Sequence, residues 1–154
     1  MQRGNDGDKL PAGALILRLF KSSDGTVPPE AFQLSAKDKQ QDVPRLSTSA
    51  EALCTRAQAH AITQRRYTHA CSLNVDDVRA LRPDPDDPRM RSPDVEWETA
   101  LDPSSGQPCT QPGAEGHCGI TELDQGGLAN IKALRKSLYR QLARLANDRA
   151  RATL

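Results

Sequence analysis

Residues 128–145 contain the pattern that most constrains the fold, because their apolar residues recur at intervals of three and four. This interval places apolar side chains along one side of an α-helix. The predicted apolar stripe consists of Leu128, Ile131, Leu134, Leu138, Tyr139, Leu142 and Leu145. The opposite side carries five cations, Lys132, Arg135, Lys136, Arg140 and Arg144. The pattern therefore predicts a basic amphipathic helix in the C-terminal segment, residues 126–154.

The charge of the chain is unevenly distributed, although the net value is only +1. Residues 127–154 contain seven Lys or Arg and one acid, a net charge of +6, so the remainder carries −5. Such asymmetry indicates either a segment that binds an external anionic partner or a basic helix neutralised by the acidic remainder. Charge alone does not separate these two interpretations.

The composition favours one small domain with many loops. A length of 154 residues suits a single domain, yet only five aromatic residues are present to fill its core. Eleven prolines and ten glycines indicate extensive loops. We expect a disordered N-terminus over residues 1–11, a small domain over 12–125 and the basic helix after it.

Strands and helices without regular alternation predict the α+β class, with a small mixed sheet of about four strands. The four predicted strands are residues 14–20, 69–75, 95–101 and 117–123, with a shorter strand at 46–49. Helices are predicted at residues 28–32 and 49–64, a polar loop at 35–44, and irregular structure in the proline-rich residues 82–93.

The four cysteines are predicted to be free thiols. No secretory signal or membrane-spanning segment is visible, so we expect a cytoplasmic chain that does not enter a membrane. Zinc sites usually take two ligands from one tight turn such as Cys-x-x-Cys, which is absent here. The soft ligand types His69, Cys71, Cys109, His117 and Cys118 are therefore not predicted to bind a metal.

Three short motifs share an order with a known enzyme family. Arg18 lies in a predicted strand, Ser47-Thr48-Ser49 ends another, and Glu96-Trp97-Glu98 lies in a third. This series resembles the Arg, Ser-Thr-Ser, Glu-x-Glu pattern of arginine-type ADP-ribosyltransferases. The resemblance implies NAD as cofactor, with Arg18 on its pyrophosphate and Ser47 orienting Glu98. It also implies that Glu98 stabilises an oxocarbenium-like transition state and that Glu96 activates the acceptor.

The same residues also have a purely structural interpretation. Arg18 then extends its aliphatic part along a sheet edge, and the Ser-Thr-Ser run ends a strand and caps a helix. Glu96 and Glu98 become the solvent-facing side of an amphipathic strand whose Val95 and Trp97 face inward. Under this interpretation the chain needs no cofactor.

The function that these observations favour is non-catalytic. We expect a small accessory protein that docks a protein partner through the apolar stripe of its C-terminal helix, with a bacterial toxin–antitoxin or defence system as the suggested setting. One alternative is NAD-dependent ADP-ribosyl transfer by the residues named above. The other alternative is nucleic-acid binding through the helix cations, which steep salt dependence would reveal.

Overall fold

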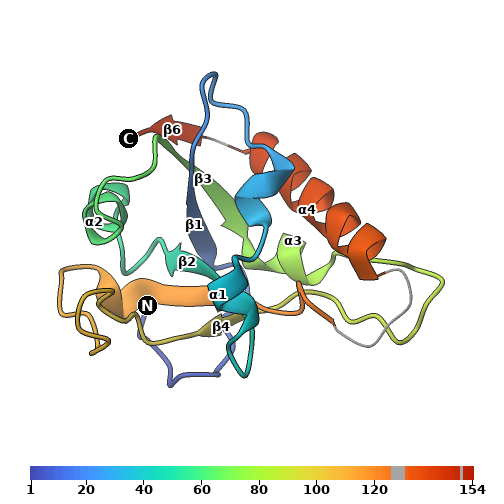
Figure 1. Ribbon diagram of the computed structural model, residues 1–154, viewed down its shortest axis with the longest axis horizontal. Coiled ribbons are helices and arrows are strands. Elements are labelled where there is room, and N and C mark those ends of the chain that lie inside the picture. The colour runs from blue at the N-terminus through green and yellow to red at the C-terminus, as the bar shows by residue number, and fades with distance from the viewer. Residues whose placement is uncertain (126–130, 150) are drawn as a thin grey trace.

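The protein has an α+β fold in which one antiparallel sheet is covered by helices on both faces (Figure 1). The computed structural model describes residues 1–125, 131–149 and 151–154. The strands are β1 (Leu15–Phe20), β2 (Leu46–Ala50), β3 (His69–Asn74), β4 (Val95–Trp97), β5 (His117–Ile120) and β6 (Arg151–Thr153). The helices are α1 (Ala36–Lys39), α2 (Arg56–Ile62), α3 (Val75–Arg79) and α4 (Ile131–Asn147), with 3-10 turns η1 (Pro29–Phe32) and η2 (Ala114–Gly116).

The sheet differs from the prediction in size and in strand direction. It has six strands in the order β4-β5-β2-β1-β3-β6, rather than about four, and all its pairs are antiparallel rather than mixed. The two strands beyond these four are β2, which corresponds to the shorter strand predicted at residues 46–49, and β6, which was not predicted. β6 lies within residues 126–154, for which the sequence predicts a helix throughout, whereas α4 ends at Asn147.

Local capping explains where two of the short helices begin. The predicted helix 49–64 is reduced to α2, because the Thr55 side chain accepts a hydrogen bond from the backbone N–H of Gln58. The Gln58 side chain in turn accepts from the backbone N–H of Thr55, which completes a capping box. Ser35 and Asp38 form the same arrangement at α1, within the segment predicted as a polar loop.

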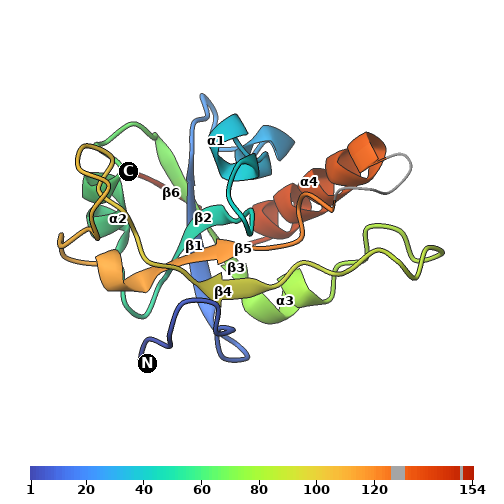
Figure 2. The same ribbon diagram turned by 60° about the horizontal axis from the view of Figure 1, so that its bottom comes forward.

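The sheet curls because its two halves separate in the middle. β1 and β2 pair only at Ile16↔Ala50 and Leu17↔Ser49, whereas β1 and β3 pair along their full length. Beyond Leu17 the two central strands diverge, and Figure 2 shows β1 running across the direction of β4 and β5. The sheet therefore consists of two three-stranded parts that meet at one short contact.

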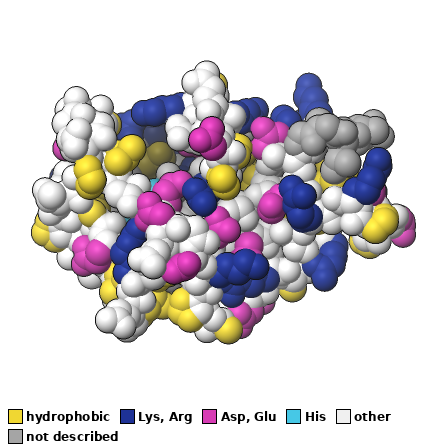
Figure 3. Space-filling model, turned by 90° about the horizontal axis from the view of Figure 1, so that it is seen from below, with side chains coloured by type: hydrophobic (Ala, Val, Ile, Leu, Met, Phe, Trp, Pro, Cys, Tyr) yellow, Lys and Arg dark blue, Asp and Glu magenta, His cyan; other side chains and the backbone are white. Residues whose placement is uncertain are grey.

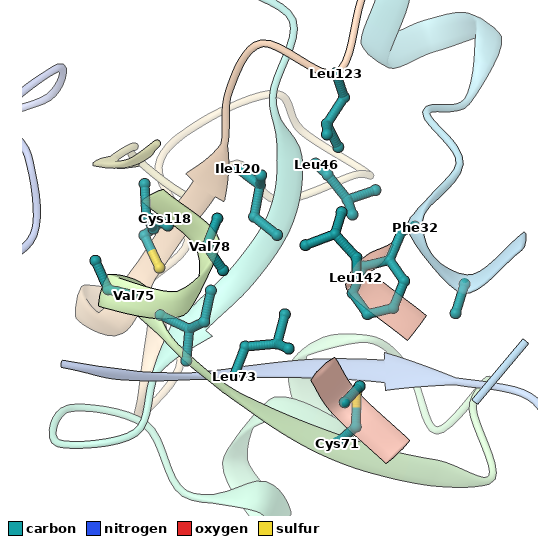
Figure 4. Close-up of a cluster of buried hydrophobic side chains, with 14 of the residues drawn as sticks. Phe32, Leu46, Cys71, Leu73, Val75, Val78, Cys118, Ile120, Leu123 and Leu142 are labelled. Carbon is teal, nitrogen blue, oxygen red and sulfur yellow. The ribbon is translucent and has the colours of Figure 1, made fainter. Parts of the chain in front are cut away.

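The main core lies between the curled sheet and the layer formed by η1 and α4. Its largest fully buried side chains include Trp97, Phe20 and Phe32, three of the five aromatic residues. Figure 4 shows Leu142 of α4 beside Phe32 of η1, with Leu46 of β2 close by. A second, smaller cluster on the other face joins Leu19 of β1 and Ala70 of β3 to Ala59 of α2 and to Cys54 just before this helix. Aliphatic and sulfur-containing side chains supply most of the remaining buried area.

The N-terminal segment runs along the edge of the sheet, which differs from the predicted disorder of residues 1–11. The backbone N–H groups of Gly7 and Leu10 donate to the carbonyls of Trp97 and Val95, and Trp97 donates to Asp8. Leu10 is also buried in the core, at 2% exposure. A polar segment becomes ordered here because β4 offers an unpaired edge. Among the described helices, none combines the length and the apolar character needed to cross a bilayer.

Candidate functional site

The inner side of α4 is part of the core of its own chain. Leu138 and Leu142 are at most 1% exposed and Tyr139 is 8% exposed, while Leu134 and Leu145 are partly buried. Leu128 lies outside the described residues, and Ile131 is described only as the first residue of the helix. The described part of the predicted stripe therefore packs against η1 and β3, which leaves little of it for a partner.

The outer side of α4 carries a row of exposed cations, which we call the cationic row. Its members are Lys132, Lys136, Arg140 and Arg144, all exposed to solvent. They are spaced four residues apart, so each step moves ~6 Å along the helix axis and only ~40° around it. The fifth predicted cation, Arg135, is partly buried and forms an ion pair with Asp124. The periodicity thus divides the helix cations into four that face water and one that anchors the helix.

The acidic residues that the structure describes do not pair with the cationic row. Within the described ranges, no salt bridge or side-chain hydrogen bond involves any of its four members. The acids instead pair with cations of the body, as Asp94 does with Lys9 and Arg79. Of the five predicted helix cations, Arg135 is the one that an acidic residue neutralises within the described part of the chain.

The residues of the predicted NAD site lie on opposite faces of the sheet. Glu96 pairs with Gly119, which pairs with Ser47, so these residues share one face. Arg18 lies two residues from Ile16 and therefore points to the same face as Ile16 and its partner Ala50. Ser49 and Ser47 are an odd number of residues from Ala50, so they point to the opposite face. Arg18 and Ser47 thus lie on different faces of the sheet. The Arg18 guanidinium reaches the backbone carbonyl of Ser47 and not its side chain. Arg18 and the two glutamates thus do not form one cleft, because order along the chain does not fix the face of a strand.

The two glutamates belong instead to an ion-pair cluster that the sequence analysis did not identify. Arg45 Nη2 lies 2.8 Å from Glu96 Oε1, and Arg45 Nη1 lies 3.3 Å from Glu98 Oε2. Burial lowers the pKa of Arg45, but hydrogen bonds and charge from Glu96 and then Glu98 raise it above its ordinary value overall. The His117 ring also contacts this cluster, because its Nδ1 lies 3.0 Å from the backbone carbonyl oxygen of Glu98.

A glycine on the intervening strand makes this ion-pair cluster possible. The Arg45 side chain must cross β5 at Gly119 to reach β4, and a Cβ at Gly119 would lie 2.6 Å from Arg45 Cβ. The sequence does contain one signal of this cluster. Arg45 is two positions before Ser47, so the alternation of a strand places it on the same face as Ser47 and Glu96. Arg45 contacts both carboxylates and so ties β4 to the chain just before β2, which suits a role in positioning the edge strand.

The cysteines are free thiols, as predicted. Cys54, Cys71 and Cys118 are buried, and burial raises the pKa of Cys71 and Cys118 to about 12, so both thiols stay protonated and weakly nucleophilic. Among the residues that the structure describes, no three His, Cys, Asp or Glu side chains group closely enough to hold a metal ion.

Comparisons with known proteins give no relative for this chain. No protein-family model, no curated protein and no solved structure matches it.

Proposed function

We propose that this protein is a non-catalytic interaction module that binds an acidic helical segment of a partner protein through the cationic row of α4. The observation that carries this proposal is the row itself, four exposed cations at a constant four-residue spacing that form no ion pair with any described residue. The proposal keeps the C-terminal helix as the docking element but moves the contact from its apolar stripe to its outer side.

Burial of the inner side of α4 gives the row a fixed geometry. Leu138, Leu142 and Ala146 hold the helix on the body at no more than 1% exposure, so the cations project from a rigid support. From Lys132 to Arg144 the row spans ~18 Å. A partner helix with acidic residues at every fourth position has the same repeat, and lies alongside with opposite charges facing each other.

An acidic protein segment suits the row better than a nucleic acid. The chain outside the C-terminal segment carries a net charge of −5, which repels an extended polyanion beyond the helix. Figure 3 shows acidic side chains interspersed with basic ones over the underside of the molecule, rather than a continuous basic surface. Tyr139, the aromatic residue of the helix, is buried and so does not offer a ring for base stacking.

The other two sequence-based functions are not proposed. Docking through the apolar stripe would require Leu138 and Leu142 to leave the core. NAD-dependent ADP-ribosyl transfer would require Arg18 to face one cleft with the glutamates, whereas Arg18 and Glu96 lie on opposite faces of the sheet.

Binding of a labelled helical peptide with glutamates at every fourth position tests the proposal. We expect a variant with Lys132, Lys136, Arg140 and Arg144 replaced by Glu to bind this peptide at least tenfold more weakly. The matched control replaces four exposed cations elsewhere, Lys37, Lys39, Arg56 and Arg65, by Glu and so changes the net charge equally. The control should retain binding, with circular dichroism confirming that both variants fold.

Two results would overturn the proposal. Equal weakening by both sets of substitutions would mean that the peptide responds to net charge and not to the row. Tighter binding of a labelled DNA duplex than of the peptide, at the same salt concentration and with the same dependence on the row, would make the protein a nucleic-acid binder.

A further inference from the structure

A pocket opens where the two halves of the sheet separate. It has a volume of about 330 Å³ and lies beside the end of β1. Arg18 and Leu19 of β1 form one part of its wall, and Tyr67, from the segment between α2 and β3, forms another. Lys21 and Glu30 are exposed at its rim. This pocket is not part of the proposed α4 interface.

Arg18 occupies the gap that the lost strand pairing creates. Its Nε donates to the Ala31 carbonyl at 2.8 Å and its Nη1 to the Ser47 carbonyl at 2.9 Å. Both acceptors are neutral backbone groups, and in the described part of the chain no carboxylate forms an ion pair with Arg18. Burial lowers the pKa of Arg18, yet a guanidinium stays charged in proteins. The gap therefore holds a cation that no described carboxylate contacts, and the charge of Asp38 acts on it only from beyond ion-pair distance.

The remaining terminal nitrogen of Arg18 is available to a ligand. Nη2 makes no hydrogen bond to the described residues, and the Arg18 side chain is only partly buried and lines the pocket. The backbone beside it is also available, because Leu19 follows Leu17, the last residue of β1 that pairs with β2. Successive residues of a strand alternate in direction, so the Leu19 N–H and C=O point toward this gap, as those of Leu17 do.

The charges and the lining residues of the pocket favour one class of ligand. Lys21 and Glu30 are of opposite charge, so the net charge of the named lining residues is +1 from Arg18. A single carboxylate balances this charge, whereas a phosphate dianion would bring excess negative charge next to Glu30. The Tyr67 ring and the Leu19 side chain suit an apolar group on the ligand. The Leu19 backbone suits an amide of the ligand.

We propose that this pocket, the Arg18 pocket, binds an α-carboxylate that is adjacent to an amide and carries an apolar side chain. This chemistry is shared by N-acylated amino acids and by the C-terminal residue of a peptide. The carboxylate lies on Arg18 Nη2, the amide pairs with the Leu19 backbone, and the side chain packs against Tyr67.

Titration of the full chain with N-acetyl-leucine and with its primary amide, followed by amide NMR shifts, tests the Arg18 pocket. We expect the acid to bind at least tenfold more tightly than the amide, with the largest shifts at Leu19 and Tyr67. Tyr67→Ala should weaken the acid at least threefold, and Arg18→Gln should abolish the difference between acid and amide. Because Arg18→Gln removes two hydrogen bonds and could unfold the chain, the acid–amide comparison on the unmodified protein stands on its own.

A third probe identifies the source of the carboxylate. A tetrapeptide ending in leucine that binds tighter than N-acetyl-leucine would assign the pocket to peptide C-termini, and equal affinity would assign it to small N-acylated acids. Equal binding of acid and amide, no shift at 10 mM of either, shifts confined to α4, or equal binding of inorganic phosphate would each overturn the proposal.

Discussion

At the scale of single residues, two arginines of the same sheet are satisfied in different ways. Arg45 contacts two carboxylates, whereas the hydrogen bonds of Arg18 within the described residues go to two backbone carbonyl oxygens. The difference follows from the strand face, since Arg45 shares a face with Glu96 and Arg18 does not. One cation is therefore compensated within the protein, and the other has capacity left for a ligand.

The Arg45 cluster gives the first prediction at this scale. Arg45→Met should lower the free energy of unfolding by about 1–3 kcal/mol, because it leaves Glu96 and Glu98 as neighbouring, partly buried like charges. Glu96→Gln in the Arg45→Met background should recover part of this loss. Urea unfolding of the two single variants and the double variant gives the coupling energy, expected at about 0.5–3 kcal/mol.

The outcome distinguishes a cluster that positions the edge strand from an ordinary surface pair. Exposed ion pairs contribute only about 0–1 kcal/mol and weaken in salt. A coupling energy near zero at low salt would place Arg45 in that class and remove the structural role assigned to it. Arg89 and Asp87, an ion pair within one exposed loop, provide the matched comparison.

At the scale of elements, α4 shows how much a periodic pattern specifies. Its spacing predicted a helix and divided the residues into two sides, both of which the structure confirms. The pattern did not state what covers the apolar side. A stripe that packs on its own domain and a stripe that docks a partner have the same period, because both need only one apolar side.

A substitution in α4 separates these two uses of the stripe. Leu142→Ala should lower the free energy of unfolding by about 2–5 kcal/mol, because Leu142 is fully buried beside Phe32 and its removal leaves a cavity. Arg140→Ala on the outer side should change it by less than about 0.5 kcal/mol. Guanidinium-induced unfolding of the two variants provides the measurement, and a change below 0.5 kcal/mol for both would mean that the helix is not part of the core.

A strand was predictable where its apolar residues either alternate with polar ones or form a continuous run. Residues 14–20 and 69–75 agree with β1 and β3 within one residue at each end. β6 was missed because its three residues, Arg-Ala-Thr, are too few for any period and pair only once β3 provides an edge. α1 was missed because its evidence is a capping box and not an apolar pattern.

The candidate sites were less predictable than the elements. A residue's face depends on its odd or even position in a strand and on the register between strands, which are long-range properties. Arg18 and Ser47 are therefore correctly placed in strands by the sequence but do not act together. The Arg18 pocket depends on where the pairing of β1 and β2 stops, and the residue types of these strands give no sign of that point.

At the scale of the whole molecule, the core compensates for few aromatic residues by burying sulfur as well as aliphatic groups. Cys71 and Cys118 lie on the face of the sheet that meets the main core, together with Trp97 and Phe20. A thiol packs as a small apolar group only while it is protonated. Global stability is therefore linked to the ionisation of these two cysteines.

This linkage predicts a loss of stability at alkaline pH. Burial raises the pKa of Cys71 and of Cys118 from 9.0 to about 12. A raised folded-state pKa contributes stability that is complete below the unfolded pKa, near pH 9, and is lost as the pH rises toward 12. Each thiol should lower the free energy of unfolding by up to about 1.4 kcal/mol per pH unit in this range. Urea unfolding at pH 8, 9 and 10 under reducing conditions measures the slope.

Cysteine variants test whether this slope comes from the core thiols. The double variant Cys71→Ala, Cys118→Ala should be less stable at pH 8, because two small cavities remain, but its stability should fall less steeply above pH 9. Cys109→Ala, at the one cysteine that is not buried, is the matched control and should keep the original slope. An unchanged slope in the double variant would mean that other ionising groups unfold the protein, and that Cys71 and Cys118 are not held as neutral thiols in the core.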